Sequence, residues 1–261
     1  MPLLIILLLA LLGYCVWANG AVVTTEYELD AGLDGELVIA QVSDLHNAVF
    51  GRGNEKLLAQ LRAAEPDVIV FTGDTVDSRR TDVDAAAELI AAAAEIAPVY
   101  CVTGNHEARL DFGAVEERLE SAGAVYLRNE AVSLGGVTLA GIDDPAFVKS
   151  GGTAAERAES LLEKLPETEG FTVLLAHRPE LAETYAGAGV SLVLSGHAHG
   201  GQIRLPFIGG LYAPTQGFFP EYDAGLYELG DTAMIVSRGL GNSLFPLRVN
   251  NRPELVVIRI K

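Results

Sequence analysis

The sequence predicts an α/β fold in which two packed sheets are flanked by helices, and three observations lead to this prediction. Apolar strands alternate with helical segments between residues 37 and 122, a pattern typical of parallel strands buried on both faces. After residue 122 the strands become shorter, which indicates a second sheet. The 261 residues, with 49% hydrophobic content, can bury a core large enough for both sheets.

The first half supplies strands and helices in turn. The expected elements are an edge strand at residues 24–29, a strand at 37–42, a helix at 54–64, a strand at 68–72, an alanine-rich helix at 83–96, a strand at 99–102 and a helix at 112–122. Pro66 and Pro98 mark two joins from helix to strand. We therefore expect a connecting segment at residues 24–36 and one domain of catalytic size over residues 37–261.

The second half opens with three short strands. The turn Gly135-Gly136 separates two of them and predicts a hairpin. The expected elements are strands at 125–127, 131–134 and 137–142, a helix at 154–165, a strand at 171–176, a helix at 179–186, a strand at 191–194, and strands near 202–205, 225–229, 233–237 and 255–260. The prevalence of strands here completes the prediction of two packed sheets with helices outside.

The N-terminal run at residues 3–18 is wholly apolar or aromatic, and the first charged residue is Glu26. An uncharged stretch of this length approaches the roughly 20 residues that span a bilayer. We interpret residues 1–23 as a membrane anchor, with the domain on the extracytoplasmic face, although no Lys or Arg precedes Arg52 to set the orientation. The alternative is a signal peptide cleaved after Val16-Trp17-Ala18, which would release a soluble secreted protein; its usual basic start is missing.

Charge and cysteine content exclude some classes of protein. The formal net charge of -17, with 35 acidic residues, argues against nucleic acid as a partner, because binding through phosphates needs clustered Lys and Arg. The two cysteines, Cys15 and Cys101, are too few for a disulfide framework. An anionic substrate must therefore be attracted by local groups.

Side chains that bind metals follow five of the predicted strands. The five stretches are Ser43-Asp44-Leu45-His46, Gly73-Asp74, Gly104-Asn105-His106-Glu107, His177 and Gly196-His197-Ala198-His199, and they contain all 5 histidines of the chain. The spacings from Asp44 to Asp74 and on to Asn105 are each about one βαβ unit, so these residues should meet at one sheet edge. Together with His46, His177, His197 and His199 they make a donor set too large for one tetrahedral zinc and suited to two bridged divalent ions.

Each stretch taken alone has a structural explanation as a turn, a helix cap or an ordinary buried histidine. Their joint occurrence at strand ends does not, because structural histidines have no reason to gather there.

These motifs resemble those of the calcineurin-like metallophosphoesterases over roughly residues 37–261. The resemblance implies a first metal held by Asp44, His46 and His199, a second held by Asn105, His177 and His197, and Asp74 as the bridge between them. It implies that His106 is the catalytic histidine, which stabilises or protonates the leaving oxygen. Gly200-Gly201-Gln202 and Ser237-Arg238-Gly239 are similar to segments of bacterial membrane-linked members.

The family resemblance implies hydrolysis of a phosphomonoester, a phosphodiester or a pyrophosphate with two divalent ions. Mixed His, Asp and Asn ligands suit manganese, zinc and iron. One alternative is a soluble secreted phosphatase whose leader has been cleaved. Another is a binding or scaffold protein on the same fold that has lost catalysis. Such a loss normally removes a ligand or the histidine, and this chain retains all of them.

Several arginines follow the motif residues closely, which predicts a position on loops at the site face. They are Arg52, Arg79, Arg80, Arg109, Arg178 and Arg204. Arg238 is a further candidate for binding the substrate phosphate. The alternative for all of them is an ordinary solvated position on a surface loop.

Apolar segments at residues 206–212 and 216–220 follow the last histidine pair too closely to lie far from it. If they are exposed, they would form an apolar rim beside a phosphate site, and we hypothesise a lipid-linked phosphate or pyrophosphate substrate. The alternative is that these side chains pack down as ordinary core.

Overall fold

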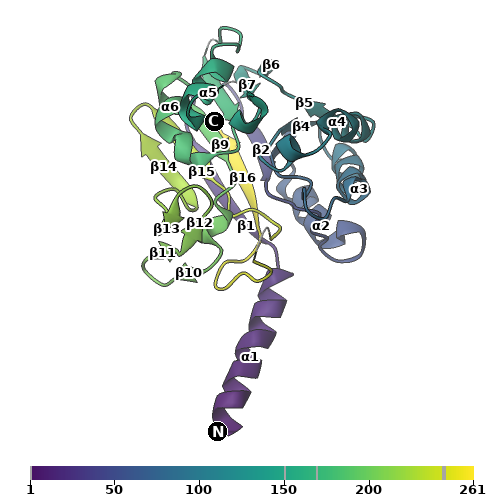
Figure 1. Cartoon of the computed structure of the whole chain (residues 1–261). Helices are drawn as coiled ribbons and strands as arrows, with labels where there is room; N and C mark the ends of the chain where they lie inside the picture. The colour runs from purple at the N-terminus through teal and green to yellow at the C-terminus, as the bar shows by residue number, and fades with distance from the viewer. Residues whose placement is uncertain (1, 150, 169, 243–244) are drawn as a thin grey trace.

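The chain, in a computed structural model, forms two facing sheets with helices on their outer sides (Figure 1). The structure describes residues 2–149, 151–168, 170–242 and 245–261, so Met1, where the expected anchor begins, lies outside them. Each main sheet has six strands. This arrangement confirms the predicted α/β sandwich.

The first sheet has the order β1-β16-β2-β3-β4-β5. Its strands are β1 (Val23–Leu29), β2 (Leu37–Val42), β3 (Val68–Thr72), β4 (Val99–Val102), β5 (Ala124–Tyr126) and β16 (Glu254–Ile260). Strands β2 to β5 run parallel, and β3, β4 and β5 are each reached through a crossover helix. These helices are α2 (Glu55–Ala64), α3 (Val83–Ala94) and α4 (Phe112–Glu120), and they lie together on one side of the domain (Figure 1).

The second sheet has the order β14-β15-β9-β8-β7-β6. Its strands are β6 (Glu130–Leu134), β7 (Val137–Gly141), β8 (Phe171–Leu175), β9 (Leu192–Ser195), β14 (Gly225–Leu229) and β15 (Thr232–Val236). Helices α5 (Ala154–Leu162) and α6 (Ala182–Gly187) pack against it. Strands β6 and β7 form the hairpin expected at Gly135-Gly136.

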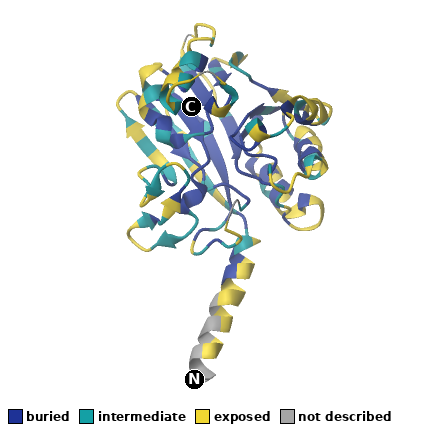
Figure 2. Cartoon of the chain, viewed as in Figure 1, coloured by how far each residue is buried: buried dark blue, intermediate teal, exposed yellow. Residues whose placement is uncertain are grey.

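The core has three layers, which follow from the alternation of side chains along each strand. In β3, Val68 and Val70 join the apolar cluster between the two sheets, whereas Ile69 and Phe71 pack under the helices of the first sheet. Figure 2 shows the central strands as buried and the helices as exposed on their outer faces. Both faces of these strands are therefore apolar, as the continuous hydrophobic runs predicted.

The segment between the N-terminal helix and β2 is partly sheet. Strand β1 pairs in parallel with β16, and β16 pairs antiparallel with β2. The last strand of the chain is thus inserted between the first two, and residues 24–36, expected as a connection with an edge strand, contribute that strand to the sheet.

Helix α1 (Pro2–Asn19) extends away from the domain (Figure 1). Cys15 and Ala18 are buried at its domain end, whereas Leu9, Leu12 and other large apolar side chains further out are exposed. Within the described ranges, the structure contains no helix with the length and apolar character needed to cross a membrane. The anchor expected over residues 1–23 stays a prediction.

Two short hairpins follow the last histidine pair. They are formed by β10 (Arg204–Leu205) with β11 (Gly209–Gly210) and by β12 (Tyr212–Ala213) with β13 (Gly217–Phe218). The sequence predicted one strand near residues 202–205, because strands of two residues are too short to show a periodic pattern. The short 3-10 helices are η1 (Arg52–Asn54), η2 (Glu107–Arg109), η3 (Pro145–Phe147), η4 (Pro179–Leu181) and η5 (His199–Gly201).

Candidate metal centre

The predicted donors meet where parallel strands of the two sheets end. Asp44 and His46 follow β2, Asp74 follows β3, and Asn105 and His106 follow β4. From the second sheet, His177 follows β8, and His197 and His199 follow β9. All eight side chains are buried at this edge. Carboxyl ends of parallel strands are the usual position of a site in α/β sheets.

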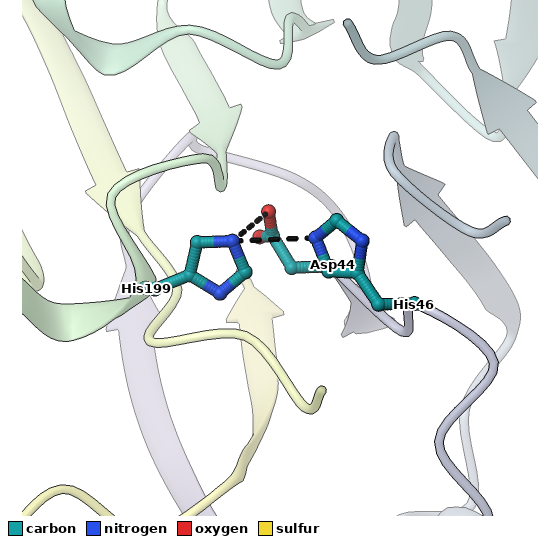
Figure 3. A group of neighbouring side chains, drawn as sticks. All are labelled: Asp44, His46 and His199. Atoms are coloured by element: carbon teal, nitrogen blue, oxygen red, sulfur yellow. Dashed lines mark hydrogen bonds and ion pairs between the residues drawn. The ribbon is translucent and has the colours of Figure 1, made fainter. Parts of the chain in front are cut away.

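Asp44, His46 and His199 form the first cluster (Figure 3). The His46 and His199 rings approach from opposite sides, and their Nε2 atoms lie 3.3 Å apart. His199 Nε2 lies 3.5 Å from Asp44 Oδ1. Three donor atoms from two sheets thus converge on one small volume, as ligands of a single ion do.

Asp74, His177 and His197 form the second cluster. His197 Nδ1 lies 3.2 Å from His177 Nε2. Asp74 Oδ2 lies 3.4 Å from His177 Nε2 and 3.6 Å from His46 Nε2 of the first cluster. The other oxygen, Oδ1, accepts a hydrogen bond from the His106 backbone N–H at 2.8 Å. One oxygen therefore fixes the carboxylate, and the other faces both clusters.

Hydrogen bonds behind the rings set which nitrogen of a ligand faces the cluster. His177 Nδ1 donates to the Thr72 carbonyl at 2.8 Å, which leaves the Nε2 lone pair directed at Asp74 and His197. His46 Nδ1 faces Asp77 Oδ2 at 3.5 Å, which favours the same tautomer. Partners of this kind orient metal-binding histidines and increase their basicity.

The pKa shifts differ within each cluster. Burial lowers the pKa of His46, but the carboxylates of Asp77 and Asp74 outweigh it, so the pKa is raised. Burial also lowers the pKa of His177, and the Asp74 carboxylate more than reverses this effect, raising the pKa to about 10. Burial and the neighbouring histidine lower the pKa of His197 and of His199 well below the usual range. Each cluster thus contains one histidine that favours the protonated form and one that stays neutral. A metal cation fits this arrangement, because it can take the place of the proton on the first histidine.

An unpartnered buried atom supports the same fit. Asn105 Oδ1 is buried without a hydrogen-bond partner in the described structure. Such an oxygen costs free energy unless something compensates it, and a divalent ion accepts a carbonyl oxygen as a ligand. The donor set therefore fits two divalent ions with Asp74 between them.

The local backbone is unusual at the predicted ligands. A positive φ is uncommon outside glycine. The ligands that adopt it are Asp44 (50°), His46 (45°), Asp74 (50°), His197 (64°) and His199 (49°). Strain of this kind collects at functional sites, where the surrounding structure maintains it.

Close approach of the loops explains two glycines. A Cβ at Gly104 would meet the backbone and carboxylate of Asp74, and a Cβ at Gly196 would meet Ser43 and Asp44. The loops that carry the predicted ligands can therefore approach this closely because one partner at each contact lacks a side chain.

Glu107 holds two of these loops together. Its buried carboxylate accepts backbone N–H groups of Asp74 at 3.0 Å, Val76 at 3.0 Å and Gly104 at 2.8 Å. Burial, and then the Asp74 charge, raise its pKa to about 7. The sequence indicated no role for Glu107 or for Asp77, although both lie in motif loops within three residues of a predicted site residue.

His106 lies beside the clusters at the cleft. Its Nδ1 accepts the Ser78 backbone N–H at 3.0 Å, so the proton of a neutral ring lies on Nε2. Burial lowers the pKa of His106 to about 4, which keeps the ring neutral at pH 7. Arg79 Nη2 lies 3.2 Å from this Nε2. Arg79 can only donate, so with the proton on Nε2 this contact sets two N–H groups against each other, and an oxygen of a substrate placed between them could accept from both.

Three of the predicted arginines line the cleft, which has a volume of ≈ 290 Å³. They are Arg79, Arg109 and Arg178. Arg178 is held by two hydrogen bonds to Asp144 at 2.7 and 3.0 Å, which fixes its orientation. Arg52, Arg80 and Arg204 are not among the lining residues, and neither is Arg238, whose guanidinium donates to Glu254 at 2.7 Å.

Arg248 connects the first cluster to α1, a link that the sequence did not indicate. Its fully buried guanidinium lies 3.4 Å from His199 Nδ1 and donates to the Arg238 and Gly241 carbonyls. Its backbone N–H donates to Asn19 Oδ1, and its carbonyl accepts from Asn19 Nδ2, both at 2.9 Å. The domain end of α1 is therefore built into the support of a predicted ligand.

Comparison with known proteins agrees with this site. Residues 37–201 match the family model described as calcineurin-like phosphoesterase. An uncharacterized metallophosphoesterase of Bacillus subtilis (strain 168), YkuE, is 32% identical over 91% of this chain and 85% of its own length. Phosphodiesterase YaeI of Escherichia coli (strain K12) is 30% identical over 75% of this chain and 71% of its own length.

Solved structures show a similar fold. The crystal structure of TT1561 from Thermus thermophilus superimposes with a TM-score of 0.50 at 15% identity, covering 79% of this chain and 91% of that one. At this identity the similarity concerns the fold alone.

Proposed function

The chain belongs to the calcineurin-like phosphoesterase family, and we propose that it hydrolyses a lipid-linked phosphodiester at a membrane surface, with two divalent ions in its cleft. Its broader activity, metal-dependent hydrolysis of a phosphoric ester, follows from family membership. The substrate class, the number of ions and the membrane attachment are the proposed parts.

One observation carries the proposal: Asp74 Oδ2 faces a histidine of each cluster, at 3.4 and 3.6 Å. Asp44, His46 and His199 would hold one ion, and Asn105, His177 and His197 the other. Manganese, zinc and iron all suit these ligands. Two such ions, when bound, would supply a nucleophilic water at neutral pH and neutralise charge on the phosphoryl oxygens.

The other cleft residues have separate tasks. Arg79, Arg109 and Arg178 line the cleft and can bind the phosphate oxygens. Asp144 restrains Arg178, so little side-chain entropy is lost when substrate binds. His106 holds its Nε2 N–H toward the region beside Arg79, where it can donate a hydrogen bond to the ester oxygen as the bond to phosphorus breaks.

The phosphodiester class is supported by the similarity to phosphodiesterase YaeI. A lipid-linked substrate is supported by hairpin β12–β13. Pro214 and Thr215 of this hairpin line the cleft, and Tyr212 and Phe218 on either side of them are exposed rather than packed into the core. An exposed apolar rim beside a phosphate site suits a substrate with acyl chains.

Attachment to a membrane is supported by α1. Its exposed side chains include Leu9, Leu12, Val16 and Trp17, and it extends away from the domain (Figure 2). Arg252 stacks over the Trp17 ring at 5.3 Å, which places a cation and an amphipathic aromatic ring together at the domain end. Such pairs suit the level of lipid headgroups.

The test is a hydrolysis screen of the purified full chain, metal by metal. It compares a long-chain phospholipid with its water-soluble headgroup diester, in wild type and in Phe218→Ser/Phe219→Ser. We expect wild type to prefer the lipid, and the double variant to lose that preference while it retains soluble turnover, because the rim contacts acyl chains and not phosphate.

Leu226→Ser is the matched control, because Leu226 is also exposed and lies on β14. This variant should keep the lipid preference. Equal turnover of lipid and headgroup in wild type would end the lipid-linked part and leave the metal site untouched.

A further inference from the structure

The two hairpins after the histidine pair present large apolar side chains to the outside. Phe207 and Ile208 lie at the tip of β10–β11, and Tyr212, Phe218 and Phe219 lie on or directly after β12–β13. Outside α1, most of the exposed large apolar side chains in the described ranges belong to this set, which we call the hairpin set. Gathered exposed apolar groups mark a surface that binds something.

The backbone keeps two of these rings out of the domain. Phe207 and Phe219 adopt left-handed conformations, with φ of 66° and 54°. For a bulky residue this conformation is an outlier that costs free energy. Phe207 is fully exposed and Phe219 is 61% exposed, so packing of these rings inside the domain offsets little of that cost. A contact of the rings with a partner outside the domain would offset more of it.

The strand directions place the cleft and α1 at the same end of the domain. Strand β1 follows α1 and runs parallel to β16, which runs antiparallel to β2, β3 and β4. The carboxyl ends of β2 to β4, where Asp44, Asp74 and Asn105 lie, are therefore beside the start of β1. In Figure 1 the labels β10 to β13 also lie toward the end from which α1 extends.

Hydrogen bonds join these parts directly. The Arg204 N–H of β10 donates to the Val249 carbonyl, and Asn250 Nδ2 donates to the Arg204 carbonyl. The neighbouring Arg248 is bonded to Asn19 at the end of α1. Hairpin β10–β11 and α1 are thus both hydrogen-bonded to the segment at residues 248–250.

The charge distribution of this end differs from that of the chain. The chain has 35 acidic residues, yet none lies between Glu183 and Glu221 or between Asp231 and Glu254. These two acid-free stretches contain the hairpin set and the support formed by Arg248 and Arg252. The carboxylates nearest to the hairpins have partners: Asp223 pairs with Arg204 at 3.0 Å, and Glu180 accepts a hydrogen bond from the Thr215 hydroxyl. The occupant that fits the apolar tips and their position at the same end as the exposed apolar side chains of α1 is a lipid bilayer.

We propose that the hairpin set is a second membrane contact: its tips insert beside α1 into the headgroup region of a bilayer, so that the cleft faces the lipid surface. The inference rests on the proposed anchoring and adds a fixed orientation to it. A domain held at two points presents its metal centre at the depth of a lipid phosphate, whereas a single helix would leave it free to tilt.

The test uses tryptophan emission of the full chain in phosphatidylethanolamine and phosphatidylglycerol vesicles with brominated acyl chains. Trp17 is the only tryptophan and reports on α1. In a Trp17→Phe background, Phe207→Trp and Phe219→Trp report on the tips, and Val125→Trp, on the exposed part of β5, is the control. We expect brominated lipid to remove most of the emission at positions 207 and 219 and none at position 125.

The outcomes separate this inference from the proposed function. If Trp17 of wild type is quenched but both tips emit fully, the anchor is retained and the second contact is wrong. If Trp17 is also unquenched, the proposed anchoring by α1 is wrong as well as the second membrane contact. If the tips are unquenched and Phe207→Ser/Ile208→Ser converts a dimer into a monomer, the surface binds a second copy and the inference is overturned. Hydrolysis of a soluble diester by each variant shows that its cleft is intact.

Discussion

Replacement of Asp74 by alanine is expected to remove most of the metal from both clusters and to lower hydrolysis of a soluble phosphodiester by more than about a hundredfold, the effect of losing even one preorganised electrostatic partner. The physical reason is that Asp74 Oδ2 faces His46 and His177 together. A ligand of one ion alone would empty one cluster. The measurement is metal content per chain with turnover.

Two further variants separate the loss of the Asp74 charge from a general effect of removing a carboxylate. Asp74→Asn keeps an oxygen for the His106 N–H but removes the charge, so it should fold as wild type and still lose metal. Asp84→Ala removes an exposed carboxylate on α3 and should change neither quantity. If Asp74→Ala retains its full complement of metal, Asp74 is not the bridge.

Replacement of His106 by alanine is expected to leave both ions bound and to lower kcat about a hundredfold or more, the usual effect of losing a preorganised hydrogen-bond donor at the atom where charge develops. The Ser78 N–H fixes Nδ1 as an acceptor, and burial keeps the ring neutral, so the Nε2 N–H can donate a hydrogen bond to the leaving oxygen. The measurement is kcat beside metal content.

The choice of leaving group makes this prediction specific. An alkoxide concentrates its negative charge on one oxygen and depends on a hydrogen-bond donor there, whereas p-nitrophenolate delocalises its charge and does not, so His106→Ala should lose more turnover on an alkyl diester than on a p-nitrophenyl diester. An equal loss on both would assign His106 to phosphate binding. Wild-type turnover on both would remove it from the mechanism.

Much of the site could be predicted because its residues follow a local rule. Asp44, Asp74, Asn105 and His177 each come shortly after an apolar strand, and parallel strands bring their carboxyl ends to one edge. The two sheets and the hairpin at Gly135-Gly136 follow from the same patterns. None of this requires knowledge of contacts between distant parts of the chain.

The residues that were missed act through contacts that no pattern encodes. Glu107 accepts from three backbone N–H groups, and Arg248 reaches His199 only because the last segment of the chain folds back beside α1. The insertion of β16 between β1 and β2 is likewise a pairing of distant segments. Loop closure of this kind leaves no periodic signal in the sequence.

The apolar loops were open to two interpretations because composition does not decide exposure. Most phenylalanines are buried, which favoured packing into the core. The structure instead exposes Phe207, Phe218 and Phe219 on hairpins whose strands have two residues each. Strands this short have no second face with which to bury such rings.

The central claim, two ions bridged by Asp74, is tested most directly by titration of the metal-free full chain. Bound metal is measured by equilibrium dialysis against Mn²⁺, and turnover of a soluble diester is measured on the same samples. We predict about two ions per chain at saturation, with turnover rising as the second ion binds. Saturation at one ion, with full turnover reached at that point, would contradict a dinuclear centre.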